Sequence, residues 1–103
     1  MIVKTTGVRA VISSAHTGEN GVLHGHTWAV VAWFNGKVDA LEAQNSLLGV
    51  AAIYDHTVLP LHLSRGEEMA EEILKELQCV GCYEVEVSRE LEGIYARARH
   101  IGN

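Results

Sequence analysis

Apolar, β-branched and aromatic positions gather in two segments near the start of the chain, and hydrophobic and polar positions alternate near its end. These two patterns together predict four strands. Segments 8–14 and 27–34 are rich in β-branched and aromatic side chains, and turn-forming residues lie between them. The first strand is expected to break near Gly7. From Tyr83 the side chains alternate again, and segment 94–98 is expected to return as the hairpin partner of that strand.

Two stretches between these strand pairs have helical spacing instead. Segment 40–53 follows Asp39, which is placed to cap a helix. Ser64 is expected to cap a second helix with apolar residues at helical spacing from Met69 to Leu77. The predicted order is therefore strand, strand, helix, helix, strand, strand. This is an α+β domain in which two helices cover one face of an antiparallel sheet.

The composition fits a single domain spanning residues 1–103, because 48% of the residues are hydrophobic and 20% are charged. Neither a membrane span nor a secretory leader is expected, so a cytoplasmic protein is the default. A formal charge of -5 argues against a nucleic-acid partner. Small molecules and further copies of the chain are the expected partners. Cys79 and Cys82 are interpreted as ordinary reduced thiols.

Histidines carry the strongest chemical signal in the sequence. His24 and His26 lie two residues apart in a predicted strand, so their rings point from the same face about 7 Å apart along the chain. His16 ends the preceding strand and arrives beside them if the two strands pair. Three imidazoles suit a zinc ion whose fourth position stays open, and Gly25 is expected to clear room for a ligand. The alternative is ordinary hydrogen-bonded histidines on a strand.

A second candidate pair follows the first predicted helix. In Asp55-His56 the carboxylate can hold an imidazole N–H, which fixes the tautomer and makes a general acid–base pair. The alternative is a polar loop without a chemical role.

Four motifs occur in order along the chain: Ser14-Ala15-His16, Leu23-His24-Gly25-His26, Asp55-His56-Thr57-Val58-Leu59 and Arg65-Gly66-Glu67-Glu68-Met69-Ala70. Together they resemble the 6-pyruvoyl/6-carboxy-tetrahydropterin synthase family. The interval of 16 residues from Asp39 to Asp55 also matches the family's spacing. The resemblance implies the tunnelling fold, whose trimers close a barrel and stack as hexamers, with active sites between subunits.

The resemblance also implies roles for these residues. His16, His24 and His26 would hold zinc, which binds the side-chain hydroxyls of a dihydropterin such as 7,8-dihydroneopterin triphosphate. Asp55 and His56 match the family's proton-relay pair. The chemistry implied is that of a lyase, which eliminates triphosphate or cleaves the side chain.

Two positions depart from the family pattern. Where the family has a catalytic cysteine this chain has Asn20, and Glu19 beside it is the candidate base. The glutamate that anchors the pterin ring in the family falls on Arg89 or on Glu90, depending on the direction of counting. We expect a β-bulge to aim Glu90 into the site. Glu67 matches the family's helix start and is a further candidate for substrate binding; the alternative is a helix-capping residue.

The leading hypothesis is a zinc-dependent lyase of the 6-carboxy-tetrahydropterin branch, which feeds deazaguanine (queuosine-type) biosynthesis. The runner-up is cleavage of the side chain to 6-hydroxymethyl-dihydropterin, as in folate synthesis, with Glu19 in place of the thiol. A non-catalytic zinc- and pterin-binding homologue and a histidine-rich metal-storage protein are the remaining alternatives. The candidate partners for the substrate's phosphates are Arg65, Arg89, Arg97 and Arg99.

Overall fold

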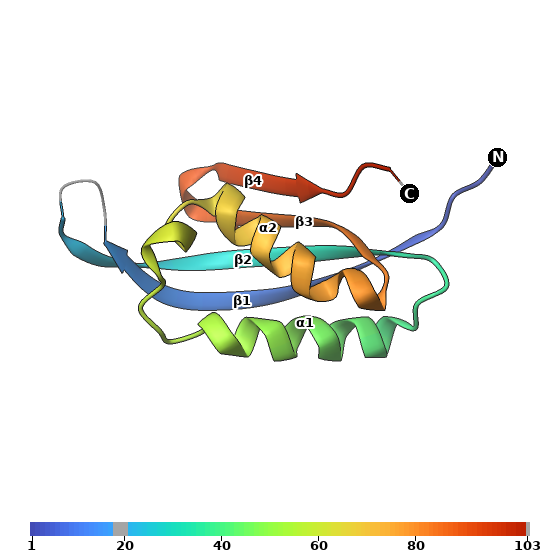
Figure 1. Ribbon diagram of the computed structural model, residues 1–103, viewed down its shortest axis with the longest axis horizontal. Coiled ribbons are helices and arrows are strands. Elements are labelled where there is room, and N and C mark those ends of the chain that lie inside the picture. Colours follow the sequence, from blue (N-terminus) through green and yellow to red (C-terminus); the bar gives the residue numbers. More distant parts are fainter. Residues whose placement is uncertain (18–20, 103) are drawn as a thin grey trace.

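A four-stranded antiparallel sheet carries both long helices on one of its faces (Figure 1). The computed structural model describes residues 1–17 and 21–102. Its elements are β1 Thr5–Thr17, β2 Leu23–Asn35, α1 Ala40–Tyr54, α2 Gly66–Leu77, β3 Cys82–Arg89 and β4 Ile94–Arg99, with short 3-10 turns at Leu61–Leu63, Gln78–Val80 and Glu90–Glu92. The predicted element order is confirmed.

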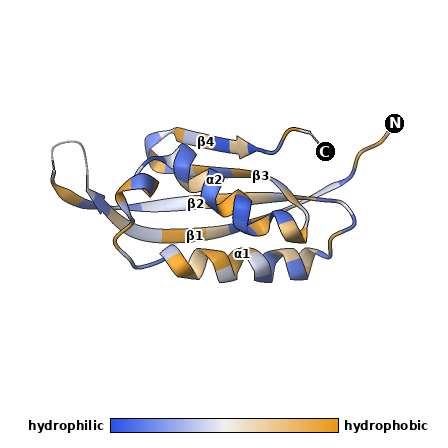
Figure 2. Ribbon diagram, in the orientation of Figure 1, coloured by the Kyte–Doolittle hydropathy of each residue, from blue (hydrophilic) through white to orange (hydrophobic). Residues whose placement is uncertain are grey.

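The strands lie in the order β1-β2-β3-β4, and every neighbouring pair is antiparallel. Helix α1 packs on β1, and α2 packs on β3 and β4. Both helices carry hydrophobic and hydrophilic segments in Figure 2, as expected for elements with one buried side. The largest fully buried side chains lie between the sheet and the helices: Phe34, Ile12, Leu47, Met69, Ile73, Leu77, Val30, Val85 and Val87.

The first strand differs from the sequence-based expectation because it runs without a break through Gly7. A Cβ atom at Gly7 would lie 2.5 Å from the ring of Trp33, its partner on β2. The glycine therefore makes room for an indole on the face away from the helices. It does not end the strand.

The predicted cap is confirmed for the first helix and not for the second. Helix α1 begins after Asp39, whose side chain accepts a hydrogen bond from the backbone N–H of Leu41, as its sequence indicated. The prediction that Ser64 caps α2 is wrong. Ser64 has helical backbone angles because it closes the preceding 3-10 turn by donating its N–H to the carbonyl of Leu61. Arg65 takes the capping position, and its side chain makes no cap hydrogen bond.

The chain that leaves α1 runs along the free edge of β1. The N–H of Ala15 bonds to the carbonyl of Thr57 at 3.0 Å, and the N–H of Leu59 bonds back to the carbonyl of Ala15 at 2.8 Å. These bonds form a short parallel bridge between Ala15 and Val58. They fix the preceding residues, Asp55 and His56, beside the end of the β1–β2 hairpin.

Two further sequence predictions concern the cysteines and the membrane. Cys79 is exposed, Cys82 is buried, and both are free thiols, as expected. None of the helices formed by residues 1–17 and 21–102 has the length and apolar character needed to cross a membrane.

Two glycines give a matched test of the fold. Gly81 has a φ of 96°, and a Cβ there would lie 2.8 Å from Val38, whereas a Cβ at Gly49 in α1 would meet nothing within 4 Å. We expect Gly81→Ala to lower the free energy of unfolding by about 1–2 kcal/mol and Gly49→Ala to raise it by about 0.5–1 kcal/mol. Urea denaturation of the two variants measures both changes, and equal changes of the same sign would contradict the assignment of Gly81.

Candidate metal centre

Three histidine rings meet at the end of the β1–β2 hairpin. His16 lies directly opposite His24 in the strand register, and His26 follows two residues later on the same face of the sheet. The ring centroids are 4.5 Å apart for His16 and His24, 4.8 Å for His16 and His26, and 4.7 Å for His24 and His26. One ligand nitrogen of each ring lies within 4.8 Å of the others. The predicted convergence is confirmed.

The surroundings of His16 and His26 favour the neutral imidazole that binds metals. The pKa of His16 is lowered by burial first and then by the neighbouring His24 and Arg89. His16 is 8% exposed, and no group within residues 1–17 and 21–102 forms a hydrogen bond with either of its ring nitrogens. The nearby backbone of Ser64 slightly opposes the lowering of its pKa. A buried imidazole without a hydrogen bond is unfavourable unless something binds it. The donor set therefore fits a divalent transition-metal ion.

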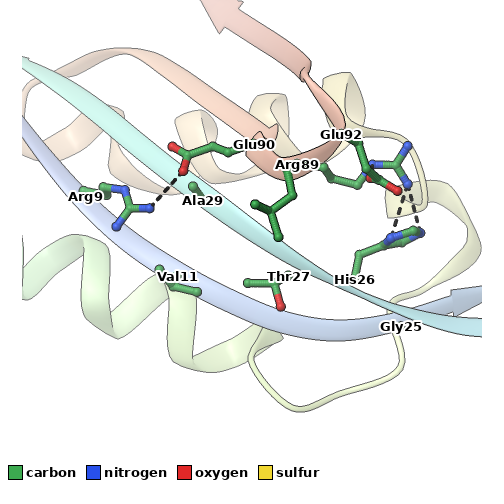
Figure 3. A pocket seen from close by; sticks show the side chains of 10 residues that line it. Arg9, Val11, Gly25, His26, Thr27, Ala29, Arg89, Glu90 and Glu92 are labelled. Carbon is green, nitrogen blue, oxygen red and sulfur yellow. Dashed lines mark hydrogen bonds and ion pairs between the residues drawn. The ribbon is translucent and has the colours of Figure 1, made fainter.

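Arg89 stands at the edge of this cluster. Its Nη1 lies 2.9 Å from Nε2 and 3.3 Å from Nδ1 of His26, as Figure 3 shows. Its Nε forms an ion pair of 2.8 Å with Glu92, and the guanidinium carbon lies 5.5 Å from the centre of the Trp28 ring. The pKa of His26 is lowered by burial and then by this arginine. Arg89 therefore supplies a fixed positive charge beside the three rings.

The side chain of Glu90 does not point toward the three histidines as expected. Arg89 pairs with Ile94 in an uninterrupted β3–β4 register, so the expected bulge is absent from that pairing. Glu90 instead begins the 3-10 turn after β3, and its carboxylate lies 3.4 Å from Arg9 on the face of the sheet away from the helices. In Figure 3 this pair lies across a hollow of about 310 Å³ from His26.

Gly25 also faces that outer side of the sheet. Side chains on a strand alternate, so a residue between His24 and His26 points away from their rings. A Cβ at Gly25 would make an ordinary contact of 3.6 Å with a backbone oxygen. The expectation that Gly25 clears room beside the metal is wrong for this reason.

Asp55 and His56 form the predicted carboxylate–imidazole contact. Oδ2 of Asp55 lies 2.9 Å from Nδ1 of His56, and Oδ1 accepts the backbone N–H of Ser13 at 2.8 Å. This N–H, followed by the His56 side chain, lowers the pKa of Asp55. His56 has a φ of 57°, which is unusual for a residue with a side chain, and its N–H bonds to the Ser13 carbonyl at 2.6 Å. Both backbone bonds hold the pair against β1.

The His56 ring is 81% exposed and borders an open hollow of about 520 Å³. Of the three clustered histidines, His26 borders the same hollow. Within one chain the proton-relay candidate thus lies near the metal candidate without a hydrogen bond to it among the described residues.

A third hollow, of about 250 Å³, lies between the start of α2 and the sheet. His16 borders it together with Trp28, Arg65, Glu67 and Arg89. Glu67 lies 3.5 Å from Arg65, and its pKa is lowered chiefly by its own backbone N–H. The sequence analysis did not single out Trp28, although the alternation that carries His24 and His26 continues to it. Glu19 lies outside the described residues.

Comparison with known proteins identifies the fold. Neither a scan of protein-family models nor a search of curated proteins found a match. Among solved structures, 6-pyruvoyl tetrahydropterin synthase from Caenorhabditis elegans matches over 98% of each chain with a TM-score of 0.75 and 17% sequence identity. The chain has the 6-pyruvoyl tetrahydropterin synthase fold. Within this pterin synthase fold, the three histidines are the candidate metal ligands and Asp55 and His56 are the candidate acid–base pair.

The lowered pKa of Asp55 gives a pH test of the relay pair. A carboxylate whose pKa is lowered by folding stabilises the protein above its ordinary pKa of about 4, and the stabilisation is lost as the pH falls through the folded-state value. We expect Asp55→Asn to reduce the urea midpoint at pH 7 and the difference from the native chain to shrink below about pH 4.

The exposed Glu71 on α2 provides the control, and Glu71→Gln is expected to leave the midpoint nearly unchanged at both pH values. A deficit of Asp55→Asn that stays constant between pH 7 and pH 3 would contradict the bonding described for Asp55.

Proposed function

We propose that this protein is a zinc-dependent lyase that acts on 7,8-dihydroneopterin triphosphate, as a 6-carboxy-tetrahydropterin synthase of the deazaguanine (queuosine-type) branch in the cytoplasm. One observation carries the proposal: the three histidines present their ring nitrogens within 4.8 Å of one another in a chain with the pterin synthase fold. Charged side chains on both sides of the cluster, Arg89 and the Asp55-His56 pair, indicate a place where a polar ligand binds.

In this proposal His16, His24 and His26 hold the zinc ion as neutral imidazoles. Three protein ligands leave a tetrahedral position open, which is typical of catalytic zinc sites. Zinc supplies Lewis acidity, which acidifies a bound hydroxyl and polarises a carbonyl. The other steps belong to the protein's own side chains.

His56 is the proposed proton carrier. Its Nδ1 is engaged by Asp55, which fixes the tautomer, so Nε2 is left to exchange a proton with substrate. Because the His56 ring is exposed at the edge of the sheet, it can serve a site on an adjoining copy of the chain. Glu19 is proposed as a second base in place of the family's cysteine.

We propose that copies of the chain assemble as a dimer of trimers. In the single chain β1 and β4 lie at the two edges of the sheet. Pairing these edges between subunits closes a barrel and removes strands that otherwise invite uncontrolled association. Glu67 beside His16 and Glu90 near His26 are the two proposed substrate contacts. Because they lie on opposite faces of one sheet, a given substrate molecule would contact one or the other.

A second candidate is a pterin-binding protein without turnover. The observation in its favour is Arg89, which occupies the end of β3 on the histidine face where an enzyme of this family has a carboxylate. Cleavage to 6-hydroxymethyl-dihydropterin remains the alternative reaction, with Glu19 as the base.

The zinc assignment is tested by metal analysis of purified variants. The native chain is expected to carry stoichiometric zinc, and His24→Ala is expected to lose at least 90% of it, because two imidazoles bind the ion far more weakly than three. His62 and His100 are exposed and outside the cluster, so His62→Ala and His100→Ala are matched controls that keep the metal. Full zinc occupancy in His24→Ala would refute the ligand assignment.

The reaction is tested by incubation with dihydroneopterin triphosphate and mass spectrometry of the product. His56→Ala is expected to keep zinc and to lower kcat by about 10²–10⁴-fold, the usual contribution of a general acid–base group. Glu19→Gln lowers it as well if Glu19 is the base. The mass of the product separates the carboxy and hydroxymethyl branches. Pterin binding with no product in any form would replace the enzyme proposal with the binding protein.

A further inference from the structure

The hollow between the start of α2 and the sheet is rich in hydrogen-bond donors. Of the four arginines that the sequence offered as phosphate partners, Arg65 and Arg89 border this hollow. Arg97 and Arg99 lie on the outer face of the sheet, where Glu84 and Glu86 pair with them at 2.8–3.6 Å. The structure thus separates two arginines beside His16 from two on the outer face. All four have a carboxylate partner, which is Glu67 for Arg65 and Glu92 for Arg89.

The guanidinium of Arg89 is fixed in place as a hydrogen-bond donor. Its Nε forms an ion pair with Glu92, and its Nη1 lies within hydrogen-bond distance of His26. The Trp28 ring packs against the guanidinium. These contacts restrict the side chain, which is 22% exposed, and leave Nη2 without a partner among the described residues. A guanidinium already fixed in place loses little conformational entropy when an anion binds to it.

The first turn of α2 adds donors on the opposite wall. Among the described residues, the capping residue Arg65 offers no side-chain acceptor to this helix. The N–H of Glu67 is engaged by its own carboxylate, and the other N–H groups of the first turn lack the acceptor that a serine or aspartate at the cap would provide. The hollow between this turn and Arg89 is also bordered by His16, which is more than nine-tenths buried and whose ring nitrogens form no hydrogen bond with the residues that the structure describes. Hydrogen-bond donors of this kind are typical of sites that bind an oxyanion.

The acceptors in this hollow are few. Among the described residues that line it, Glu67 is the one carboxylate, and it is engaged by Arg65 and by its own backbone. An aminopyrimidine edge presents two N–H donors and requires a free carboxylate opposite them. Glu90 is not available here because it lies on the other face of the sheet with Arg9.

We propose that this hollow binds an oxyanion of the ligand, a phosphate or a carboxylate group, between Arg89, Arg65 and the first turn of α2, directly beside His16. The proposal rests on the proposed function in one respect, because it takes the three-histidine cluster as the place where the ligand is held. It predicts that the anionic end of the ligand, and not a donor-bearing ring edge, enters the hollow.

The test is calorimetric titration of the full chain with inorganic phosphate, tripolyphosphate and acetate. Arg89→Gln is expected to weaken binding of the preferred anion by about 10–100-fold, the loss typical of one charge-assisted contact. Arg97→Gln is the matched control, since it removes an arginine from the outer face, and it should leave the affinity unchanged. Tighter binding of the phosphates assigns the hollow to a phosphate group, and tighter binding of acetate assigns it to a carboxylate.

Further variants keep the test decisive. If Arg89→Gln does not fold, Arg65→Gln at the exposed rim takes its place, with a smaller expected loss of about 3–10-fold. Equal affinity for every anion in the native chain and in the Arg89 or Arg65 variant overturns the proposal. So does binding that His24→Ala abolishes and these variants leave intact, because the metal alone would then hold the anion.

The two proposals fail separately. Unchanged anion binding in Arg89→Gln, together with zinc and turnover in the native chain, would remove the oxyanion site and leave the enzyme. Arginine-dependent anion binding in a chain that holds no zinc and forms no product would do the reverse.

Discussion

The pairing of β1 with β2 is the constraint on which the candidate site depends. It sets His16 opposite His24 and leaves His26 on the same face. Slipping the register by one residue would turn one strand's side chains to the other face and separate the rings. The same register buries Ile12 and Val30 against the helices, so the packing of the core and the geometry of the three imidazoles are fixed together.

The two faces of the sheet have different chemistry. On the helix side lie the three histidines, Arg89 and the uncapped start of α2. On the other side lie Glu90 with Arg9 and the ladder of charges that joins β3 to β4. His56 reaches neither interior, because the bridge between Ala15 and Val58 holds it at the strand edge. Among the described residues of one chain, His56 therefore makes no hydrogen bond to the three histidines, and in the proposed assembly of several copies it would serve a neighbouring site.

Sequence reasoning recovered the order of the elements because β-branched and aromatic segments, helical spacing and a period of two are each local patterns. It recovered the meeting of the histidines because residues i and i+2 of a strand share a face and a short connection brings His16 beside them. It also recovered the contact between Asp55 and His56. The prediction for Ser64 failed because this residue ends the preceding 3-10 turn and so cannot also cap α2. The prediction for Gly25 failed because the same alternation that joins His24 and His26 turns the residue between them away.

Glu90 and Arg89 show a different limit. A bulge in the β3–β4 register would decide which of these two adjacent residues faces the site. No local sequence pattern predicts such a bulge. Trp28 was passed over because a tryptophan in a strand is usually part of the core, and its position beneath Arg89 depends on a strand distant in sequence.

X-ray absorption at the zinc edge of the purified protein, combined with anomalous diffraction from its crystals, tests the central claim most directly. We expect one anomalous peak between His16, His24 and His26, with three nitrogen ligands at about 2.0–2.1 Å and one further light-atom ligand. Zinc bound elsewhere, or no metal peak between the three rings in crystals grown with zinc, would contradict the account.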